Sequence, residues 1–363
     1  MSAEWRERIE MSRLLHIATL ALLLASIGHA AALPQRQDVP GPADGYTSLS
    51  TAPLTHCIAF SAYVDGYDPI SGPHPGPELV DQLMARVRDM GFRCILVYGT
   101  MAEFDPIYVA AERYGLQVIA IIWLDGDATF NQASIAAGIQ RAKAQPQIVV
   151  RLSCGSEVRI RHGVAVAEPI IRDCLTQVVE AGVSKPVGYI DSWWGWCDEA
   201  WPCRTWGLAS QVDWIGVNIY PWWENKYSGL YPCTPAEDAA AFTVARYQAM
   251  RDHYSGREVL LTEFGWPAGP DDYMPTNAYT GQQCGVASPA NQHLVIEQTL
   301  DALDAAGLSG ILFQAFREPW KVRYEGPVGE YWGVCSESAP YTCPFAYGMR
   351  WRSFLPLVLT MRQ

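Results

Sequence analysis

The chain has 363 residues, of which 49% are hydrophobic and 18% charged, so it can bury a large core and is not mainly disordered. Its formal net charge of −12 argues against nucleic acid and anionic membrane surfaces as partners, because both would repel an acidic protein. The length fits one large domain or two ordinary ones.

The N-terminal region has the features of an export signal. An apolar run over residues 14–27 follows Arg13, and the small residues 28–32 offer an A-x-A cleavage site before Leu33. A retained membrane anchor is the alternative, but the run is shorter than the ~20 apolar residues that a span needs. We predict a signal peptide over 1–32 and a Pro-, Gly- and Ser-rich linker over 33–54. The mature protein would be secreted, periplasmic or held at the cell surface, without a membrane anchor.

The remaining region, 55–363, has a regular pattern of short apolar and β-branched runs separated by stretches of helical periodicity. Helices are expected over 77–90, 132–143 and 289–305, and the first of these carries apolar residues at spacings of three and four. The strand-like runs cover 57–64, 94–98, 117–123, 148–152, 186–190, 214–220, 259–262 and 310–316.

This alternation predicts parallel strands, and eight of them close a barrel, so the expected fold is α/β: a single (β/α)8 TIM barrel. The rival architecture is an open doubly wound sheet. No G-x-G-x-x-G motif follows an early strand, which weakens a dinucleotide site. The segments 191–210, 268–288 and 322–345 are interpreted as long loops at the C-terminal face of the barrel, where loops build a binding cleft.

Ten cysteines in an exported chain indicate disulfides, because no paired C-x2-C spacing with companion histidines points to zinc. We expect no metal and no cofactor. The first pairs to consider, in the elaborated loops, are Cys197 with Cys203 and Cys335 with Cys343. For cysteines in strand-like runs, a bridge and a buried free thiol stay open; these are Cys57, Cys94 and Cys154.

Two glutamates follow strand-like runs directly and are the candidate catalytic residues. Glu157 comes after the fourth run and Glu263 after the seventh, and catalytic groups of barrel enzymes lie at the C-terminal ends of strands. Cleavage of a glycosidic bond needs two carboxyl groups, separated by about 5 Å when the anomeric configuration is retained. The 14 Trp and 18 Tyr residues agree weakly with a sugar ligand, because aromatic faces stack on sugar rings but also fill cores.

The run Leu-Thr-Glu-Phe-Gly-Trp-Pro over 261–267 resembles the nucleophile motif of glycoside hydrolase family 17, the β-1,3-glucanases and glucanosyltransferases. Three further runs are similar to motifs of this family and occur in its order: Cys-Gly-Ser-Glu-Val over 154–158, Gly-Val-Asn-Ile-Tyr-Pro-Trp over 216–222, and Phe-Gln-Ala-Phe-Arg-Glu-Pro-Trp-Lys over 313–321. The run Leu-Val-Tyr-Gly over 96–99 is also similar to a family strand. The resemblance covers roughly residues 55–325.

The resemblance implies a retaining mechanism on β-glucan, with Glu157 as acid/base and Glu263 as nucleophile. Tyr220 would hold and tune the nucleophile, and Glu318 and Lys321 would form a polar pair near the cleft. The residues expected to line sugar subsites are Asn218, Trp222, Trp266 and Trp320. The alternatives without a role in binding are a place in the core at the barrel rim for Trp222 and Trp266, and a surface ion pair for Glu318 with Lys321.

Two departures from the family pattern stand out. Ser156 precedes the acid/base where relatives usually have Asn, whose amide can hold the sugar 2-hydroxyl, so Ser156 is a substrate-binding candidate with a shorter reach. Gln314 and Arg317 stand where many relatives carry acidic residues. The expected partner is a polysaccharide or oligosaccharide bound by a monomer. Two alternatives stay open: a transglycosylase of the same family, and a barrel that binds polysaccharide without turnover.

Overall fold

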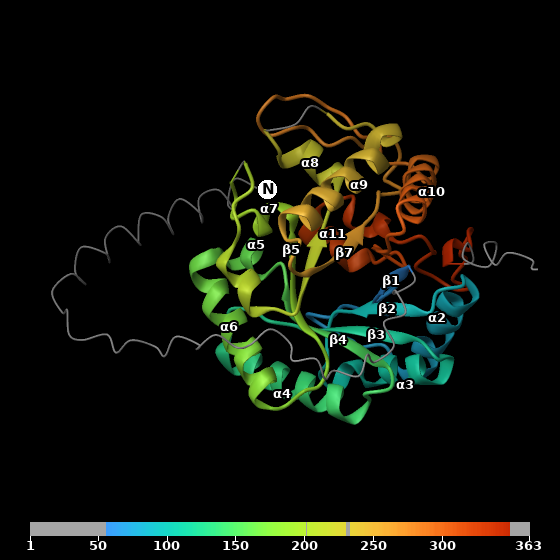
Figure 1. Ribbon diagram of the computed structural model, residues 1–363. Helices are drawn as coiled ribbons and strands as arrows, with labels where there is room; N and C mark the ends of the chain where they lie inside the picture. The colour runs from blue at the N-terminus through green and yellow to red at the C-terminus, as the bar shows by residue number, and fades with distance from the viewer. Residues whose placement is uncertain (1–55, 201, 230–232, 349–363) are drawn as a thin grey trace, which may run out of the picture. The chain divides into compact units, whose positions relative to one another are not determined.

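The computed structural model describes residues 56–200, 202–229 and 233–348 (Figure 1). The predicted signal peptide and linker lie outside these residues. The described chain forms a closed barrel of parallel strands in the order β1-β2-β3-β4-β5-β6-β7-β8. This confirms the predicted TIM barrel, and the open doubly wound alternative is wrong.

The strands correspond to the eight expected runs, with shifted ends. They are β1 (Cys57–Phe60), β2 (Cys94–Val97), β3 (Gln117–Ile122), β4 (Val149–Ser156), β5 (Val187–Ser192), β6 (Trp214–Asn218), β7 (Glu258–Phe264) and β8 (Gly310–Leu312).

Three strand ends at the barrel mouth differ from the expected ends by four residues, and the first is β1, which stops at Phe60 rather than at residue 64. β4 continues to Ser156 rather than ending at residue 152, because it stays paired with β5, and the next amide, of Glu157, donates to Ile190 O at 2.9 Å. β8 stops at Leu312 rather than at residue 316. Beyond it the chain still bonds to its neighbours, with Ala315 N donating to Ala59 O at 2.9 Å, but irregularly.

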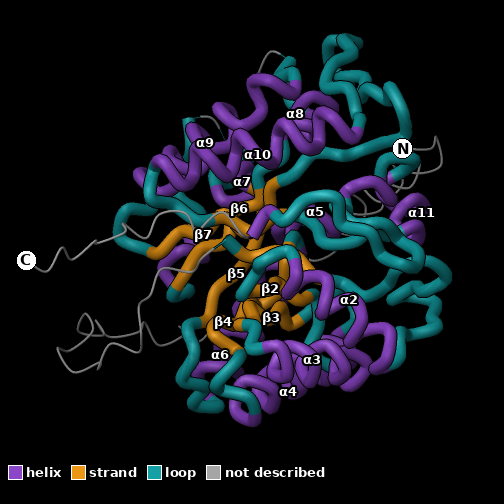
Figure 2. The backbone as a smooth tube through the Cα atoms, turned by 90° about the vertical axis from the view of Figure 1, so that its right-hand side faces the viewer, coloured by secondary structure: helices purple, strands orange, loops and turns teal. Residues whose placement is uncertain are grey.

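Helices surround the strands, as Figure 2 shows in purple around orange. The long ones are α2 (Pro77–Asp89), α3 (Asp105–Tyr114), α4 (Ala128–Ala144), α6 (Val164–Glu180), α9 (Ala236–His253) and α10 (Pro289–Ala305). Short helices occupy the loops: α5 (Val158–His162), α7 (Trp193–Trp196), α8 (Pro221–Tyr227) and α11 (Val322–Glu325), with 3-10 turns η1 (Ala102–Phe104), η2 (Gly207–Gln211), η3 (Pro319–Lys321) and η4 (Gly329–Trp332). All three predicted helices are present, and the second begins four residues earlier than expected, at Ala128, because Asp127 caps it through Thr129 N and Phe130 N.

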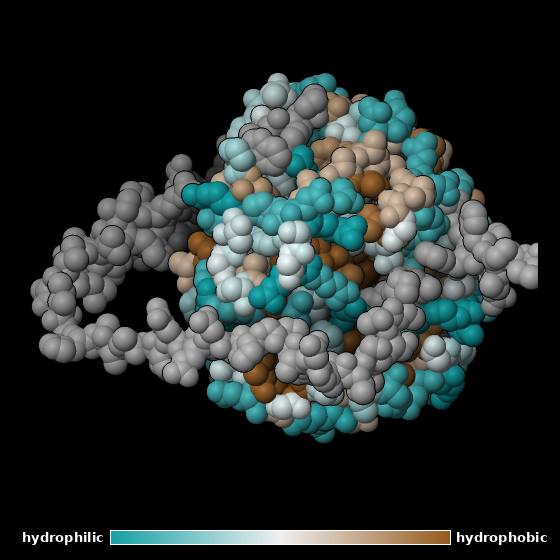
Figure 3. Space-filling view, viewed as in Figure 1, coloured by the Kyte–Doolittle hydropathy of each residue, from teal (hydrophilic) through white to brown (hydrophobic). Residues whose placement is uncertain are grey.

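The core has two layers because side chains of a strand alternate between faces. Ile58 on β1 and Ile95 on β2 point outward and pack against the helices. Ala59 and Leu96, the next residues on the same strands, point into the barrel. The inner layer fills the barrel and the outer layer holds the helices. On the face shown in Figure 3, hydrophilic residues predominate among the coloured residues, with apolar patches between them.

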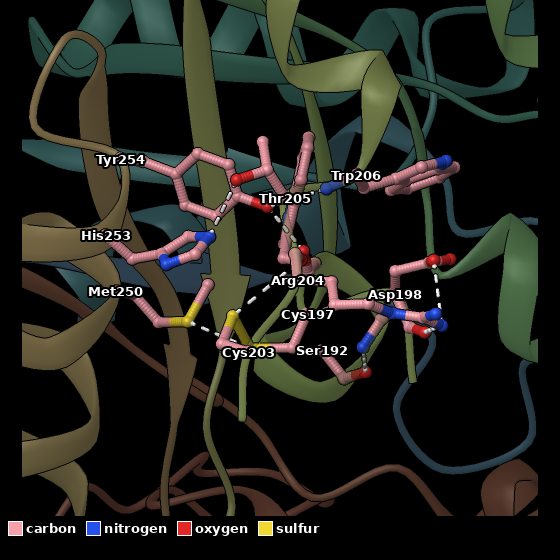
Figure 4. The surroundings of a disulfide bond; sticks show 12 residues. Ser192, Cys197, Asp198, Cys203, Arg204, Thr205, Trp206, Met250, His253 and Tyr254 are labelled. Atoms are coloured by element: carbon pink, nitrogen blue, oxygen red, sulfur yellow. Dashed lines mark hydrogen bonds and ion pairs between the residues drawn. A yellow bond between two sulfur atoms is a disulfide. The ribbon is translucent and has the colours of Figure 1, made fainter. Parts of the chain in front are cut away.

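All ten cysteines are paired. The loop bridges Cys197–Cys203 and Cys335–Cys343 are as predicted. The cysteines left open form bridges too: Cys57–Cys94 joins β1 to β2 inside the barrel, and Cys154–Cys174 joins β4 to α6. Cys233–Cys284 ties two loops. In the surroundings of Cys197–Cys203, Trp206 N donates to Tyr254 OH at 3.2 Å and the Met250 sulfur lies 3.8 Å from Cys197 Sγ (Figure 4).

Candidate active site

The end of β4 turns sharply at Glu157. Gly155 has φ 96° and Glu157 φ 53°, so both lie in the left-handed region that non-glycine residues seldom adopt. A side chain at Gly155 would meet Val158 Cγ2 at 2.6 Å, which explains glycine there. A hydrogen bond of 2.9 Å from the Glu157 backbone N–H to Ile190 O stabilises this left-handed conformation. Strain of this kind occurs where a side chain must be aimed at a site.

Glu157 is oriented by a neighbour on β6. Asn218 Nδ2 donates to Glu157 Oε1 at 2.9 Å, and Asn218 Oδ1 accepts a hydrogen bond of 2.8 Å from Thr262 on β7. Burial raises the pKa of Glu157 above its ordinary value, while the Asn218 hydrogen bond and the charge of Arg161 oppose the rise. The carboxyl group of Glu157 therefore stays protonated to a higher pH than that of an exposed glutamate.

Glu263 is enclosed on β7 and receives two phenolic hydrogen bonds. Tyr98 OH donates to Oε1 at 2.8 Å and Tyr220 OH to Oε2 at 2.7 Å, and the side chain is only 6% exposed in total. Burial raises its pKa to about 8, and the nearby charge of Glu157 adds to this. The two tyrosines and Lys321 oppose the rise, because each stabilises the carboxylate.

The two glutamates meet at the barrel mouth through β6. Asn218 holds Glu157 through its side chain, and its Cα is the register partner of Glu263. The charge of Glu157 also raises the pKa of Glu263. Both glutamates thus lie beside Asn218 at the same end of the barrel.

The polar pair near the cleft is buried, so the surface-pair alternative is wrong. Lys321 Nζ lies 2.8 Å from Glu318 Oε2 and donates to Gln314 Oε1 at 2.6 Å, while Ser61 donates to the other Glu318 oxygen. Glu318 is 1% and Lys321 8% exposed. A buried ion pair with further hydrogen bonds is held rigidly, and it places a positive charge near Glu263.

The tryptophans expected at subsites differ in exposure. Trp222 and Trp266 are both 0% exposed, and their indole Nε1 atoms donate at 2.9 Å to Gly285 O and Val286 O. They present no accessible ring face and hold the 268–288 loop against the barrel. Trp320 is partly exposed, whereas Ser156 is buried beside the turn at Glu157.

Tyr98, Trp332 and Glu325 received no role from the sequence. The only signal for Tyr98 was its position directly after a strand, in a run similar to a family strand. Trp332 lies far along the chain, yet its ring packs 5.2 Å from Tyr220 and 6.0 Å from Phe313. Its indole nitrogen donates to Glu325 Oε2 at 2.9 Å. No motif indicated this contact, because a long loop brings Trp332 back over the barrel.

Within the described part of the chain, no cluster of three or more His, Cys, Asp or Glu side chains could hold a metal ion. In the same part, no helix has the length and apolar character to cross a membrane.

Two carboxyl groups lie at the C-terminal end of the (β/α)8 barrel, the end at which barrel enzymes carry their active sites. A family model, the BtgE/BtgC glycoside hydrolase domain, matches residues 57–333. The chain belongs to this family, and the resemblance to glycoside hydrolase family 17 is confirmed.

Individual relatives are more distant. A glucan 1,3-beta-glucosidase of Arthroderma benhamiae is 25% identical over 234 residues, which are 63% of this chain and 71% of that protein. The cell surface mannoprotein MP65 of Candida albicans is 24% identical over 279 residues, 74% of this chain, and the match spans 65% of its length. The crystal structure of a family 17 β-1,3-glucanosyltransferase from Rhizomucor miehei superposes with a TM-score of 0.61 at 18% identity, covering 81% of this chain and 98% of that chain, which establishes the shared fold.

Proposed function

We propose that the protein is a retaining glycoside hydrolase that acts on β-1,3-linked glucan, with Glu263 as nucleophile and Glu157 as acid/base. The observation that carries the assignment is the unequal set of hydrogen bonds on the two carboxyl groups. Glu263 accepts from two phenols and Glu157 from one amide. The two phenolic hydrogen bonds stabilise the charge on Glu263 against the burial that raises its pKa to about 8, so with one proton on the pair we assign the charge to Glu263 and the proton to Glu157.

In the first step, a Glu263 oxygen attacks the anomeric carbon and the bond to the leaving oxygen breaks. Glu157 gives its proton to that oxygen, so the leaving chain departs as a neutral alcohol. In the second step Glu157 takes a proton from water, and the water oxygen displaces Glu263 from the anomeric carbon. An acceptor sugar in place of water would give transglycosylation by the same chemistry.

The glucan substrate rests on the relatives, which are named for action on β-1,3-glucan. Tyr98, Tyr220, Asn218 and Ser156 would surround the sugar at the reacting centre, and partly exposed Trp320 would line the cleft. Trp222 and Trp266 would support the cleft from behind, because they lack an accessible ring face. The Glu318–Lys321 pair would fix the electrostatics of the nucleophile.

Secretion or display at the cell surface is part of the proposal. Five disulfides join all ten cysteines, and such bonds persist in oxidising compartments. A monomer stays a prediction, which size-exclusion chromatography with light scattering would check.

The test is hydrolysis of laminarin by the wild type, Glu157→Gln and Glu263→Gln. Both substitutions should lower kcat by at least about a thousandfold, because each removes a group that reacts. Glu112→Gln is the matched control, since the exposed side chain of Glu112 accepts hydrogen bonds from Gln145 and Gln147, which precede β4 at the end of the barrel opposite the mouth. Proton NMR of the first product should show the β-anomer. Wild-type activity in either active-site variant, or an inverted product, would overturn the assignment.

Two further readouts separate the alternatives. Longer products at high donor concentration would identify a transglycosylase. Binding of laminarin with no release of reducing ends would identify a non-catalytic barrel.

A further inference from the structure

The turn at Glu157 and the start of α5 are fixed on one side to β5. The Glu157 backbone N–H donates to Ile190 O at 2.9 Å, and Arg159 N donates to the Tyr189 hydroxyl at 3.3 Å. Tyr189 in turn donates to the buried carboxyl group of Asp191 at 2.6 Å. Two backbone N–H groups thus tie the turn to β5, but they leave its other side, toward β3, to a different residue.

Arg161, in α5, makes the connection to β3. Its Nη1 donates to Ser156 O, at the end of β4, at 2.7 Å, and its Nη2 donates at 2.9 Å to Leu124 O, two residues beyond the end of β3. The guanidinium carbon also lies 4.2 Å from the centroid of the Trp123 ring. Arg161 is exposed as a residue, yet its planar head group bridges two neighbouring strand ends, which a rigid fork of N–H donors does well.

Arg161 binds the backbone on both sides of Glu157. Ser156 O belongs to the peptide group before Glu157, and Glu157 O, in the peptide group after it, accepts a hydrogen bond of 3.2 Å from Arg161 N. Glu157 has φ 53°, and a non-glycine residue keeps such a backbone only when the surrounding contacts enforce it. Loss of the Arg161 side chain would remove one of these contacts and release the turn from β3.

The charge of Arg161 also acts on Glu157. Burial raises the pKa of Glu157, and the Asn218 hydrogen bond and the positive charge of Arg161 lower it. The other ionisable groups that interact with Glu157 or Arg161 are Asp125, Tyr189, Asp191, Glu263, Tyr98, Tyr220 and Glu325. These groups are acids, and the neighbouring His162 is paired with Asp125 at 2.6 Å.

We propose that Arg161 is a positioning residue for the acid/base: its guanidinium joins the ends of β3 and β4 and holds the turn that aims Glu157 at the reacting oxygen. Arg161 itself takes no part in bond making or breaking. Its charge favours the ionised form of Glu157, which takes the proton from water in the second step. The role deepens the proposed function and rests on it.

Arg161→Met and Arg161→Lys separate the bridge from the charge. Methionine removes both, whereas lysine keeps the charge but is a single point donor that does not bridge two carbonyl oxygens. On laminarin, Arg161→Met should lower kcat by roughly tenfold to a hundredfold with little change in KM, because a misaimed acid slows the reaction without removing a substrate contact. The basic limb of its kcat/KM profile should move to higher pH, since Glu157 then stays protonated to higher pH.

Arg161→Lys should lower kcat as well but keep the basic limb of the wild type. Arg113→Met is the matched control, because this exposed arginine on α3 pairs with Asp81 on α2, in the outer layer of helices. Its kcat and its pH profile should equal those of the wild type.

The titration of Glu157 gives a readout that needs no turnover. In protein with an isotope label at the glutamate carboxyl carbons, the NMR signal that Glu157→Gln removes reports the pKa of Glu157. This pKa should be higher in Arg161→Met than in the wild type and Arg161→Lys. If the wild type releases no reducing ends, the proposed function fails, while this titration still decides whether Arg161 acts on Glu157.

Three results would overturn the positioning role. The first is a rise in KM with unchanged kcat in Arg161→Met, which would make Arg161 a substrate contact. The second is an unchanged pH profile and titration in Arg161→Met, and the third is an equal shift in Arg161→Lys. Circular dichroism and Tm show whether each variant is folded. If Arg161→Met does not fold, Arg161→Lys decides alone, since wild-type kcat in that variant excludes the bridge.

Discussion

Asn218 and Glu157 are joined by a hydrogen bond of 2.9 Å from the side-chain amide to Oε1. The amide cannot rotate freely, because Thr262 on the next strand donates to its oxygen at 2.8 Å. Side chains of two neighbouring strands, β6 and β7, thus orient one carboxyl group, and the backbone of the same asparagine pairs with the strand that carries Glu263. Asn218 is the residue that couples the two carboxyl groups.

Asn218→Ala should lower kcat/KM by about tenfold to a hundredfold, because Glu157 loses its orientation. Loss of this donor removes an interaction that favours the charged form, so the pKa of Glu157 should rise further. The acid must be protonated to act, so the basic limb of the pH profile should move to higher pH. Thr262→Val, which only loosens the amide, should have a smaller effect in the same direction. An unchanged profile in Asn218→Ala would contradict this coupling.

Tyr220→Phe should move the acidic limb of the pH profile to higher pH. The nucleophile must be ionised, and removal of a phenolic donor raises the pKa of Glu263. Tyr98→Phe should act in the same sense. Tyr114→Phe is the control, since its hydroxyl bonds Asp81 on α2, away from the mouth. The measurement is kcat/KM on laminarin from pH 3 to pH 9, and a shift to lower pH would refute the role of the phenols.

The barrel and its carboxylate pair could be predicted from the sequence for a physical reason. Strand period, helix period and the position of Glu157 and Glu263 directly after apolar runs are local features, and a closed parallel barrel brings all strand ends to one face. Tyr98 could have been predicted at the same end of the barrel by the same reasoning, because it directly follows β2.

The contacts that depend on loops could not be predicted. Trp332 reaches Tyr220 through a long segment without periodicity, and no local pattern says where such a segment returns. Trp222 and Trp266 lie beside strand ends, as sugar-binding residues do, yet the 268–288 loop covers them. Exposure depends on the covering segment, which the sequence near a tryptophan does not reveal.

Asp191→Asn should make stability less dependent on pH. Asp191 is fully buried on β5, and burial raises its pKa from 3.8 to about 7, although Tyr189 donates a hydrogen bond to it at 2.6 Å. A carboxyl group with a raised folded-state pKa contributes stability below its unfolded pKa and loses it as pH rises through 7.

The wild type should therefore lose stability between about pH 4 and pH 8, and Asp191→Asn should lose less, by up to a few kcal/mol. Urea unfolding at pH 4, 6 and 8 gives the difference between the two proteins, in which the shared titrations of Glu263 and Glu325 cancel. A parallel decline in wild type and variant would show that Asp191 does not control this dependence.

Gly265→Ala should disturb both stability and activity, because Gly265 directly follows β7, lies against the backbone that follows β8, and is two residues from the proposed nucleophile. A Cβ there would lie 2.4 Å from the backbone oxygen of Phe313, a contact that only a backbone shift can relieve. Phe313 N also donates to Phe264 O at 2.9 Å, so the shift would pull on the residue next to Glu263. We expect a loss of about 2 kcal/mol in the free energy of unfolding and a fall in kcat larger than that in 1/KM.

Gly256→Ala is the matched control, since a Cβ at Gly256 meets nothing within 4 Å. Its Tm and kcat should stay close to the wild type, and similar behaviour of Gly265→Ala would show that the β7–β8 contact does not position Glu263.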